Sequence, residues 1–72
     1  MQFAQIFTKL LENKMITPYR MSKESGIPNR MIGRWKNGEI YPSAENLIKI
    51  ADYLDVSVDY LLGRTDKPEI NK

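Results

Sequence analysis

Three observations predict an all-α fold of five short helices for this chain. Apolar residues recur three and four positions apart, as on one face of a helix. Ser, Thr or Pro stands where most of these segments begin, and Gly or Asn where they end. No stretch alternates between apolar and polar residues, as a half-buried strand does. The chain has 72 residues, 42% of them hydrophobic, which is enough for one small domain and not for two.

The first helix is expected to be about three turns long. Phe3, Ile6, Phe7, Leu10 and Leu11 follow one another at helical spacing and form a single apolar stripe. We therefore expect this stripe to be buried in the core.

The second and third helices follow within a few residues. Thr17 can cap the second helix with its hydroxyl, and Pro18 suits the first helical position. Gly26 ends this helix after about two turns. A third helix is predicted over residues 29–37 and stops at Gly38.

Two further helices complete the fold. Ser43, after a proline, begins a fourth helix whose apolar side chains share one face. That face consists of Leu47, Ile50, Ala51 and Leu54. Ser57 caps a short fifth helix that runs to Leu62 and ends at Gly63. Residues 1–63 are therefore expected to form the domain, and 64–72 a flexible C-terminal tail.

Cys and His are both absent, and this excludes several classes of function. Neither a disulfide framework nor a thiolate or imidazole metal site is available. A nucleophile paired with His is excluded as well. The N-terminus shows no basic segment followed by a long apolar run, so we expect no secretory signal and a cytoplasmic protein. We expect no cofactor, no metal and no membrane association.

The charge is distributed unevenly along the chain, although the net charge is only +2. Residues 1–38 carry seven Lys and Arg against two acids, a net charge of +5. Residues 39–72 carry four against seven, a net charge of −3. Such a division can present a basic face to a polyanion while the rest of the molecule repels it.

Residues 18–37 have the pattern of two helices that cross steeply over a tight turn. Ser22 is small where the two backbones would approach, and Gly26 tolerates the positive φ of the turn. The neighbouring apolar residues are expected to face the core: Met21, Ile27, Ile32 and Trp35. Trp35 could instead stack on a base, but its spacing from Ile32 favours the core.

The opposite side of the third helix has a different character. This outer face consists of Asn29, Arg30, Gly33, Arg34 and Asn37. A helix with its side chains is about 10–12 Å across, which suits the major groove of B-DNA. Arg can contact guanine with two hydrogen bonds and Asn can do the same for adenine. Gly33 allows a close approach, at a cost in helix propensity.

Residues 6–63 resemble the lambda-repressor-like (Cro/C1, XRE-type) helix-turn-helix family of phage and bacterial repressors. The matching strings are ITPYRMSKESGIPNRMIGRWKNG, the linker EIYPS, and AENLIKIADYLDVSVDYLLG. The resemblance covers most of the chain and includes several spaced features at once. It implies a compact five-helix bundle in which the second and third helices form the helix-turn-helix.

The resemblance also implies a role for individual residues. Asn29, Arg30 and Arg34 are expected to contact DNA bases. The residues expected to hold the DNA backbone are Thr17, Tyr19, Lys36, Asn37 and Tyr41. Related repressors pair through the start of the fifth helix, which gives Val58 and Tyr60 a place in a homodimer contact on DNA. In a monomer, these two residues would equally well lie at the rim of the core.

The sequence departs from the family pattern at three places. Pro18 replaces the Gln with which the second helix usually begins. Leu11 and Lys36 occupy the positions of an Arg–Glu ion pair, so Lys36 becomes a free cation. Pro28 replaces the usual Ser or Thr cap of the third helix.

The function expected from these observations is sequence-specific binding of double-stranded DNA by a transcriptional regulator, a repressor of phage or mobile-element type. Its partner would be a two-fold symmetric operator, and it would act by binding this operator and not by catalysing a reaction. The alternative is a protein-interaction module of the same fold, such as an antitoxin or anti-repressor. An enzyme would have to rely on Ser22 and Lys23, which point to different sides of a helix.

Overall fold

The computed structural model describes residues 2–68, which form five α-helices and no strand. These helices are α1 (Gln2–Asn13), α2 (Pro18–Ser25), α3 (Asn29–Lys36), α4 (Ala44–Leu54) and α5 (Val58–Leu61). The predicted all-α class is confirmed. The third and fifth helices each end one residue earlier than predicted, because Asn37 and Leu62 are the C-cap residues.

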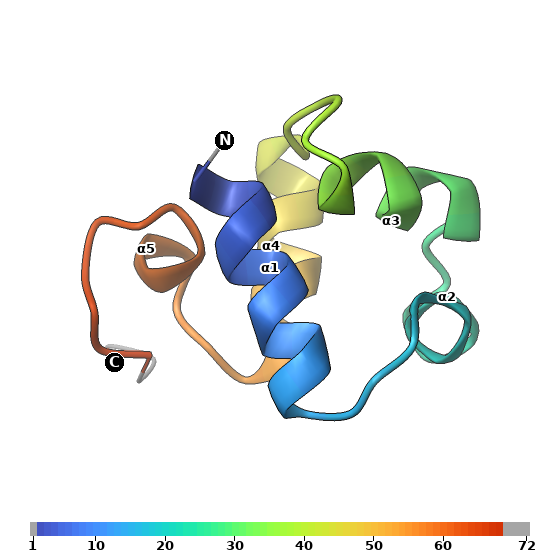
Figure 1. Cartoon of the computed structure of the whole chain (residues 1–72), viewed down its shortest axis with the longest axis horizontal. Helices are drawn as coiled ribbons and strands as arrows, with labels where there is room; N and C mark the ends of the chain where they lie inside the picture. Colours follow the sequence, from blue (N-terminus) through green and yellow to red (C-terminus); the bar gives the residue numbers. More distant parts are fainter. Residues whose placement is uncertain (1, 69–72) are drawn as a thin grey trace.

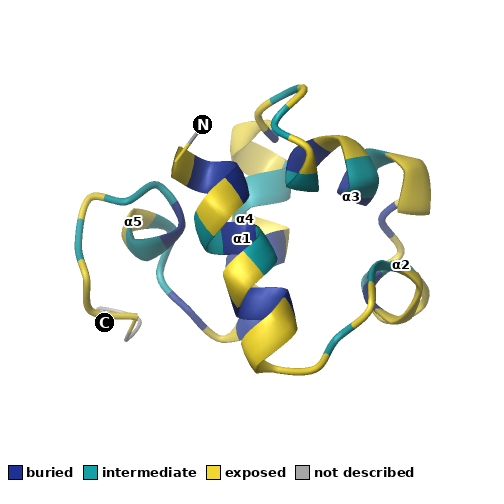
Figure 2. Ribbon diagram, viewed as in Figure 1, coloured by how far each residue is buried: buried dark blue, intermediate teal, exposed yellow. Residues whose placement is uncertain are grey.

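The helices surround a common centre (Figure 1). In that view α1 and α4 occupy the middle, α2 and α3 lie on one side of them, and α5 lies on the other. The picture shows α2 end-on and α3 lengthwise, so the two helices cross steeply. The buried faces of the helices point towards this centre, and the outer surfaces of α2 and α3 are exposed (Figure 2).

Hydroxyl groups cap three of the helices at their N-termini. The side chains of Thr17, Ser43 and Ser57 each accept a hydrogen bond from the backbone N–H three residues further on, at 3.1, 3.2 and 3.0 Å. Each bond satisfies a donor that the helix itself leaves unpaired. Pro28, the N-cap of α3, makes no such bond.

All five helices end in a residue with left-handed backbone conformation. These residues are Met15, Gly26, Gly38, Asp55 and Gly63, with φ between 57° and 80°. At all of them except Gly26, the next residue donates its backbone N–H to the carbonyl five positions earlier, at 2.9–3.0 Å. This is the Schellman arrangement, which satisfies free carbonyl groups at the end of a helix.

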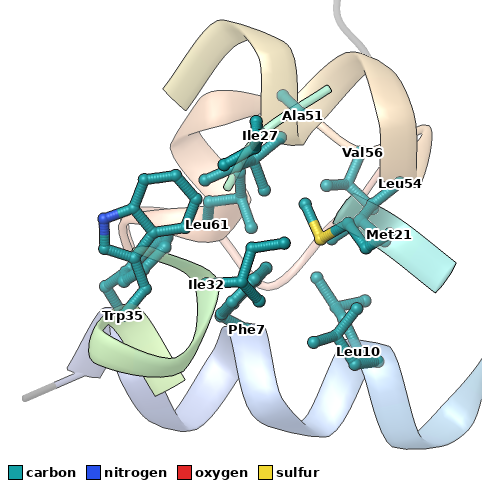
Figure 3. Packing of buried hydrophobic residues seen from close by; sticks show 13 residues of the cluster. Phe7, Leu10, Met21, Ile27, Ile32, Trp35, Ala51, Leu54, Val56 and Leu61 are labelled. Atoms are coloured by element: carbon teal, nitrogen blue, oxygen red, sulfur yellow. The ribbon is translucent and has the colours of Figure 1, made fainter. Parts of the chain in front are cut away.

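The core is a single cluster of apolar side chains contributed by all five helices (Figure 3). The Phe3 and Phe7 rings stack with centroids 5.4 Å apart. The Phe7 ring meets Trp35 edge-on, with an interplanar angle of 74°. Trp35 is fully buried, which excludes the alternative in which its ring stacks on a base. Its indole N–H has no acceptor among the described residues, at a cost of about 1–3 kcal/mol.

The segment after α5 turns back along the molecule. The Ser57 N–H donates to the carbonyl of Pro68 at 2.9 Å, which places residue 68 beside the start of α5. Residues 69–72 lie outside the described part of the chain. The flexible tail over residues 64–72 therefore stays a prediction.

Candidate nucleic-acid interface

The turn between α2 and α3 is stabilised by hydrogen bonds from side chains. The Ser22 hydroxyl donates to the carbonyl of Ile27 at 2.6 Å, across the turn. The Ser25 hydroxyl accepts from the Ile27 N–H at 3.2 Å and donates to the carbonyl of Met21 at 2.6 Å. Gly26 has φ 80°, and a Cβ added to it would meet no atom within 4 Å. The glycine is therefore required by the backbone conformation and not by lack of space.

Helix α3 has one buried and one exposed side. Ile32 and Trp35 are fully buried. Asn29, Arg30 and Arg34 are all exposed on the outer face. The fold therefore brings the three side chains expected to contact bases onto one exposed surface. Asn37, the C-cap of α3, is also exposed at the end of that face.

Gly33 lies in the middle of the outer face without a structural reason for being glycine. It is within the helix and is not among the residues with positive φ. A Cβ added to it would meet no protein atom within 4 Å. Glycine here costs about 1 kcal/mol in helix propensity. Packing within the folded chain therefore gives no reason for a glycine at this position.

The residues expected at the DNA backbone lie around α3. The Thr17 hydroxyl is the N-cap of α2. Tyr19 is 61% exposed, and the Lys23 ammonium lies 5.3 Å from its ring centroid. Tyr41, in the linker, is 57% exposed, and its ring lies 6.2 Å from that of Phe3. Each of these side chains is accessible to a partner on the surface.

Lys36 lies at the edge of a groove between the end of α3 and α1. Thr8, Lys9 and Asn13 line the α1 side of this groove. Leu11, in contrast, is buried in the core. Lys36 forms no ion pair within residues 2–68, which agrees with the free cation expected from the sequence. The groove thus contains two Lys residues, one from each helix, together with Glu12 of α1.

Glu39 contacts the outer face of α3, and the sequence did not identify it as a residue of the candidate interface. Its Oε1 lies 3.8 Å from Arg34 Nε, and its Oε2 accepts a hydrogen bond of 3.5 Å from Asn37 Nδ2. The sequence contains a weak signal for this arrangement, since an acid directly follows the Asn37-Gly38 helix stop. The contact itself depends on the backbone conformation of that stop.

A hydrogen-bonded group ties α2 to α4. The Glu24 carboxylate accepts from the Tyr53 hydroxyl and, at 3.3 Å, from Arg20 Nε. These hydrogen bonds, Tyr53 first and Arg20 second, lower the pKa of Glu24. Burial, followed by the bond to Glu24, raises the pKa of Tyr53. The group stabilises the ionised form of Glu24 and connects α2 with α4 on the surface.

Val58 and Tyr60 lie in different surroundings. Val58 lines a hollow between α4 and α5, together with Ile48, which is 56% exposed. Tyr60 lines another hollow with Ile6, at the start of α1. Both side chains are partly buried against the core. The structure therefore does not bring the two residues onto one continuous patch.

Residues 2–68 contain neither a candidate membrane-spanning helix nor a candidate metal site. None of these helices has the length and apolar character needed to cross a membrane. No group of three or more Asp and Glu side chains in this range could hold a metal ion.

Comparison with known proteins identifies the family. The helix-turn-helix family model matches residues 8–61. The chain belongs to the XRE-type helix-turn-helix family. The match includes all of α2, α3, α4 and α5, and with them the outer face of α3.

Three curated proteins are similar to the chain. The cryptic phage CTXphi transcriptional repressor RstR of Vibrio cholerae is 44% identical over 67% of the chain and 43% of its own length. An uncharacterized HTH-type transcriptional regulator of Haemophilus influenzae is 37% identical over 82% of the chain and 25% of its own length. The HTH-type regulator YobD of Bacillus subtilis is 30% identical over 93% and 60%. The chain thus spans between a quarter and three fifths of these relatives. No solved structure matches it.

Proposed function

We propose that the protein is a sequence-specific, double-stranded DNA-binding transcriptional regulator that inserts α3 into the major groove. The observation that carries this proposal is the exposed outer face of α3, which contains Asn29, Arg30 and Arg34 and no acid. These are the side chain types that pair with guanine and adenine in the major groove. The similarity to a phage repressor supports a repressor of phage or mobile-element type. Such a protein acts in the cytoplasm by occupying its operator as a homodimer, without metal or cofactor.

The proposal divides the interface into two kinds of contact. Asn29, Arg30 and Arg34 contact bases and determine sequence preference. The residues that contact phosphates are Thr17, Tyr19, Lys36, Asn37 and Tyr41. Phosphate contacts fix the position of the protein on DNA and contribute the salt-dependent part of the affinity.

Two substitutions test this division. Arg34→Ala should cost about 1–3 kcal/mol in binding and relax the preference at one base position. Lys36→Ala should weaken binding to all sequences alike and reduce the salt slope by about one. Binding of both variants is measured against a set of duplexes with single base changes, at several salt concentrations. Identical profiles for the two variants would contradict the division.

The DNA site itself is obtained by selecting random duplexes with the purified protein at about 150 mM salt, where non-specific binding is weak. A two-fold symmetric site would support sequence-specific binding by a homodimer. An asymmetric half-site would support DNA binding by a monomer and contradict the dimer.

A second candidate function is the binding of a partner protein. The hollow between α4 and α5 favours it, because Ile48 exposes more than half of its surface there beside Val58. Exposed apolar side chains of this kind often mark protein contacts. If the selection enriches no duplex, and Val58→Asp abolishes binding of a partner protein, this function replaces the first.

A further inference from the structure

The backbone at the end of α3 fixes the position of Glu39. Gly38 has φ 75°, and its N–H donates to the carbonyl of Trp35 at 3.2 Å. The Glu39 N–H donates to the carbonyl of Arg34 at 3.0 Å. Two hydrogen bonds and a glycine in left-handed conformation thus hold Glu39 beside the turn that contains Arg34.

The same backbone arrangement produces the same kind of side chain pair at the end of α5. The Arg64 N–H donates to the carbonyl of Asp59 at 2.9 Å, and the Arg64 and Asp59 side chains form an ion pair of 3.6 Å. In both pairs the two residues are five positions apart. The basic residue comes first at the end of α3, and the acidic residue comes first at the end of α5. Pairing of Glu39 with Arg34 is therefore a consequence of the helix end, and a substitution that keeps Gly38 leaves the backbone in place.

The Glu39 carboxylate contacts the outer face of α3 at two points. One oxygen lies 3.8 Å from Arg34 Nε, and the other accepts from Asn37 Nδ2 at 3.5 Å. Since the carboxylate lies at Nε, the two terminal nitrogens of the guanidinium are the ones left for a base. These two nitrogens match the O6 and N7 acceptors of guanine. The arrangement therefore favours one orientation of Arg34 towards a base pair.

We propose that Glu39 is a positioning residue that increases sequence specificity, by orienting Arg34 and by repelling the DNA backbone. This inference rests on the proposed function. Glu39 is the one acid between Glu24 and Glu45 in the sequence, and this segment contains all of α3. Its charge opposes phosphate for every DNA sequence, and non-specific affinity depends chiefly on phosphate. At the correct site, the contact between Arg34 and its base offsets part of this repulsion. The Glu39 charge therefore lowers the affinity for the correct site less than it lowers the affinity for other sequences.

The variant Glu39→Gln tests the proposal, because it removes the charge and keeps the size of the side chain. Discrimination at the base position that Arg34→Ala relaxes should fall by about two- to fivefold, the range expected of an exposed ion pair. Affinity for random duplex should rise. Both are measured by competition titrations with the selected duplex, its single-base variants and random duplex.

Two controls separate positioning from charge alone. Asp66→Asn makes the same change in net charge in the segment after α5, which lies across the molecule from α3 (Figure 1). It should leave base discrimination unchanged. In the Arg34→Ala background, Glu39→Gln should no longer alter the preference at that base position.

Three results would overturn the proposal. One is unchanged discrimination in Glu39→Gln, and another is an equal loss in Asp66→Asn. The third is a change in preference that persists without Arg34. If the wild-type protein selects no duplex at all, the proposed function itself fails. That outcome differs from the other three, in which wild-type binding is intact.

Discussion

Met15 is strained by its own backbone conformation. It ends α1 with φ 57°, and its side chain is 86% exposed. A residue with a Cβ loses roughly 1–2 kcal/mol in this conformation, and packing returns little of it here. We expect Met15→Gly to raise the free energy of unfolding by about 0.5–1 kcal/mol, after the entropy that glycine loses on folding is subtracted. Thermal and urea unfolding measure the change.

Met15→Ala provides the control for this prediction. Alanine removes the same exposed side chain but keeps the Cβ that causes the strain. Its stability should therefore remain close to that of the wild type. An equal gain in both variants would show that the methionine side chain, and not the backbone angle, is responsible.

The sequence predicted those residues whose role depends on near neighbours in the chain. Thr17, Ser43 and Ser57 are the caps expected of them, because a cap bonds to a backbone N–H three residues away. The left-handed residues were predicted where they are glycine and were missed at Met15 and Asp55. At these two positions the residue type does not indicate a positive φ. The left-handed conformation is held instead by the backbone hydrogen bonds at the end of the helix.

At the scale of the helix, α3 combines a stability cost with an open surface. Gly33 weakens the helix, and yet an added Cβ meets no protein atom within 4 Å. Gly33→Ala should therefore stabilise the fold by about 1 kcal/mol. If α3 approaches DNA closely at this position, the same methyl group should weaken specific binding by about 1–3 kcal/mol, as for an overpacked contact. Unfolding and binding titrations on one sample give the two values.

Gly33→Ala is predicted to raise stability and to lower DNA affinity, and these opposite changes can be told apart from a folding defect. A variant that is more stable and binds DNA less well cannot owe its loss to misfolding. If Gly33→Ala binds as tightly as the wild type, the closest approach of α3 to DNA lies elsewhere. Gly33→Ser, which is larger, should weaken binding at least as much as Gly33→Ala.

The contacts between helices were not predictable from the sequence to the same extent. Tyr53 and Glu24 are 29 residues apart in the chain, and their hydrogen bond exists only once α2 and α4 have docked. The contact of Glu39 with Arg34 depends on the left-handed turn at Gly38. The exposed residues of α3, in contrast, could be predicted because helical spacing separates them from the buried Ile32 and Trp35. The face was thus predictable, and the groups that orient it were not.

For the whole molecule, the arrangement of the helices separates two surfaces. α2 and α3 lie on one side of α1, and α5 lies on the other (Figure 1). A contact between two copies at the hollow of α4 and α5 would therefore leave both α3 helices exposed. Two exposed α3 helices related by a two-fold axis require half-sites about one helical turn of DNA apart. This geometry connects the proposed homodimer to the symmetry of the operator.

The substitution Val58→Asp tests that connection. Val58 is the first residue of α5, where an acid is compatible with the helix dipole, and its side chain is only partly buried, so the fold should persist with some loss of stability. In a two-fold contact, the new carboxylates of the two copies would repel each other. We expect binding to a duplex with both half-sites to weaken by about tenfold or more. Binding to a single half-site should not change, because α3 is remote from the substitution. Equal binding of wild type and variant to the full site would place the dimer contact on another surface, since only a residue at the contact can separate the two affinities.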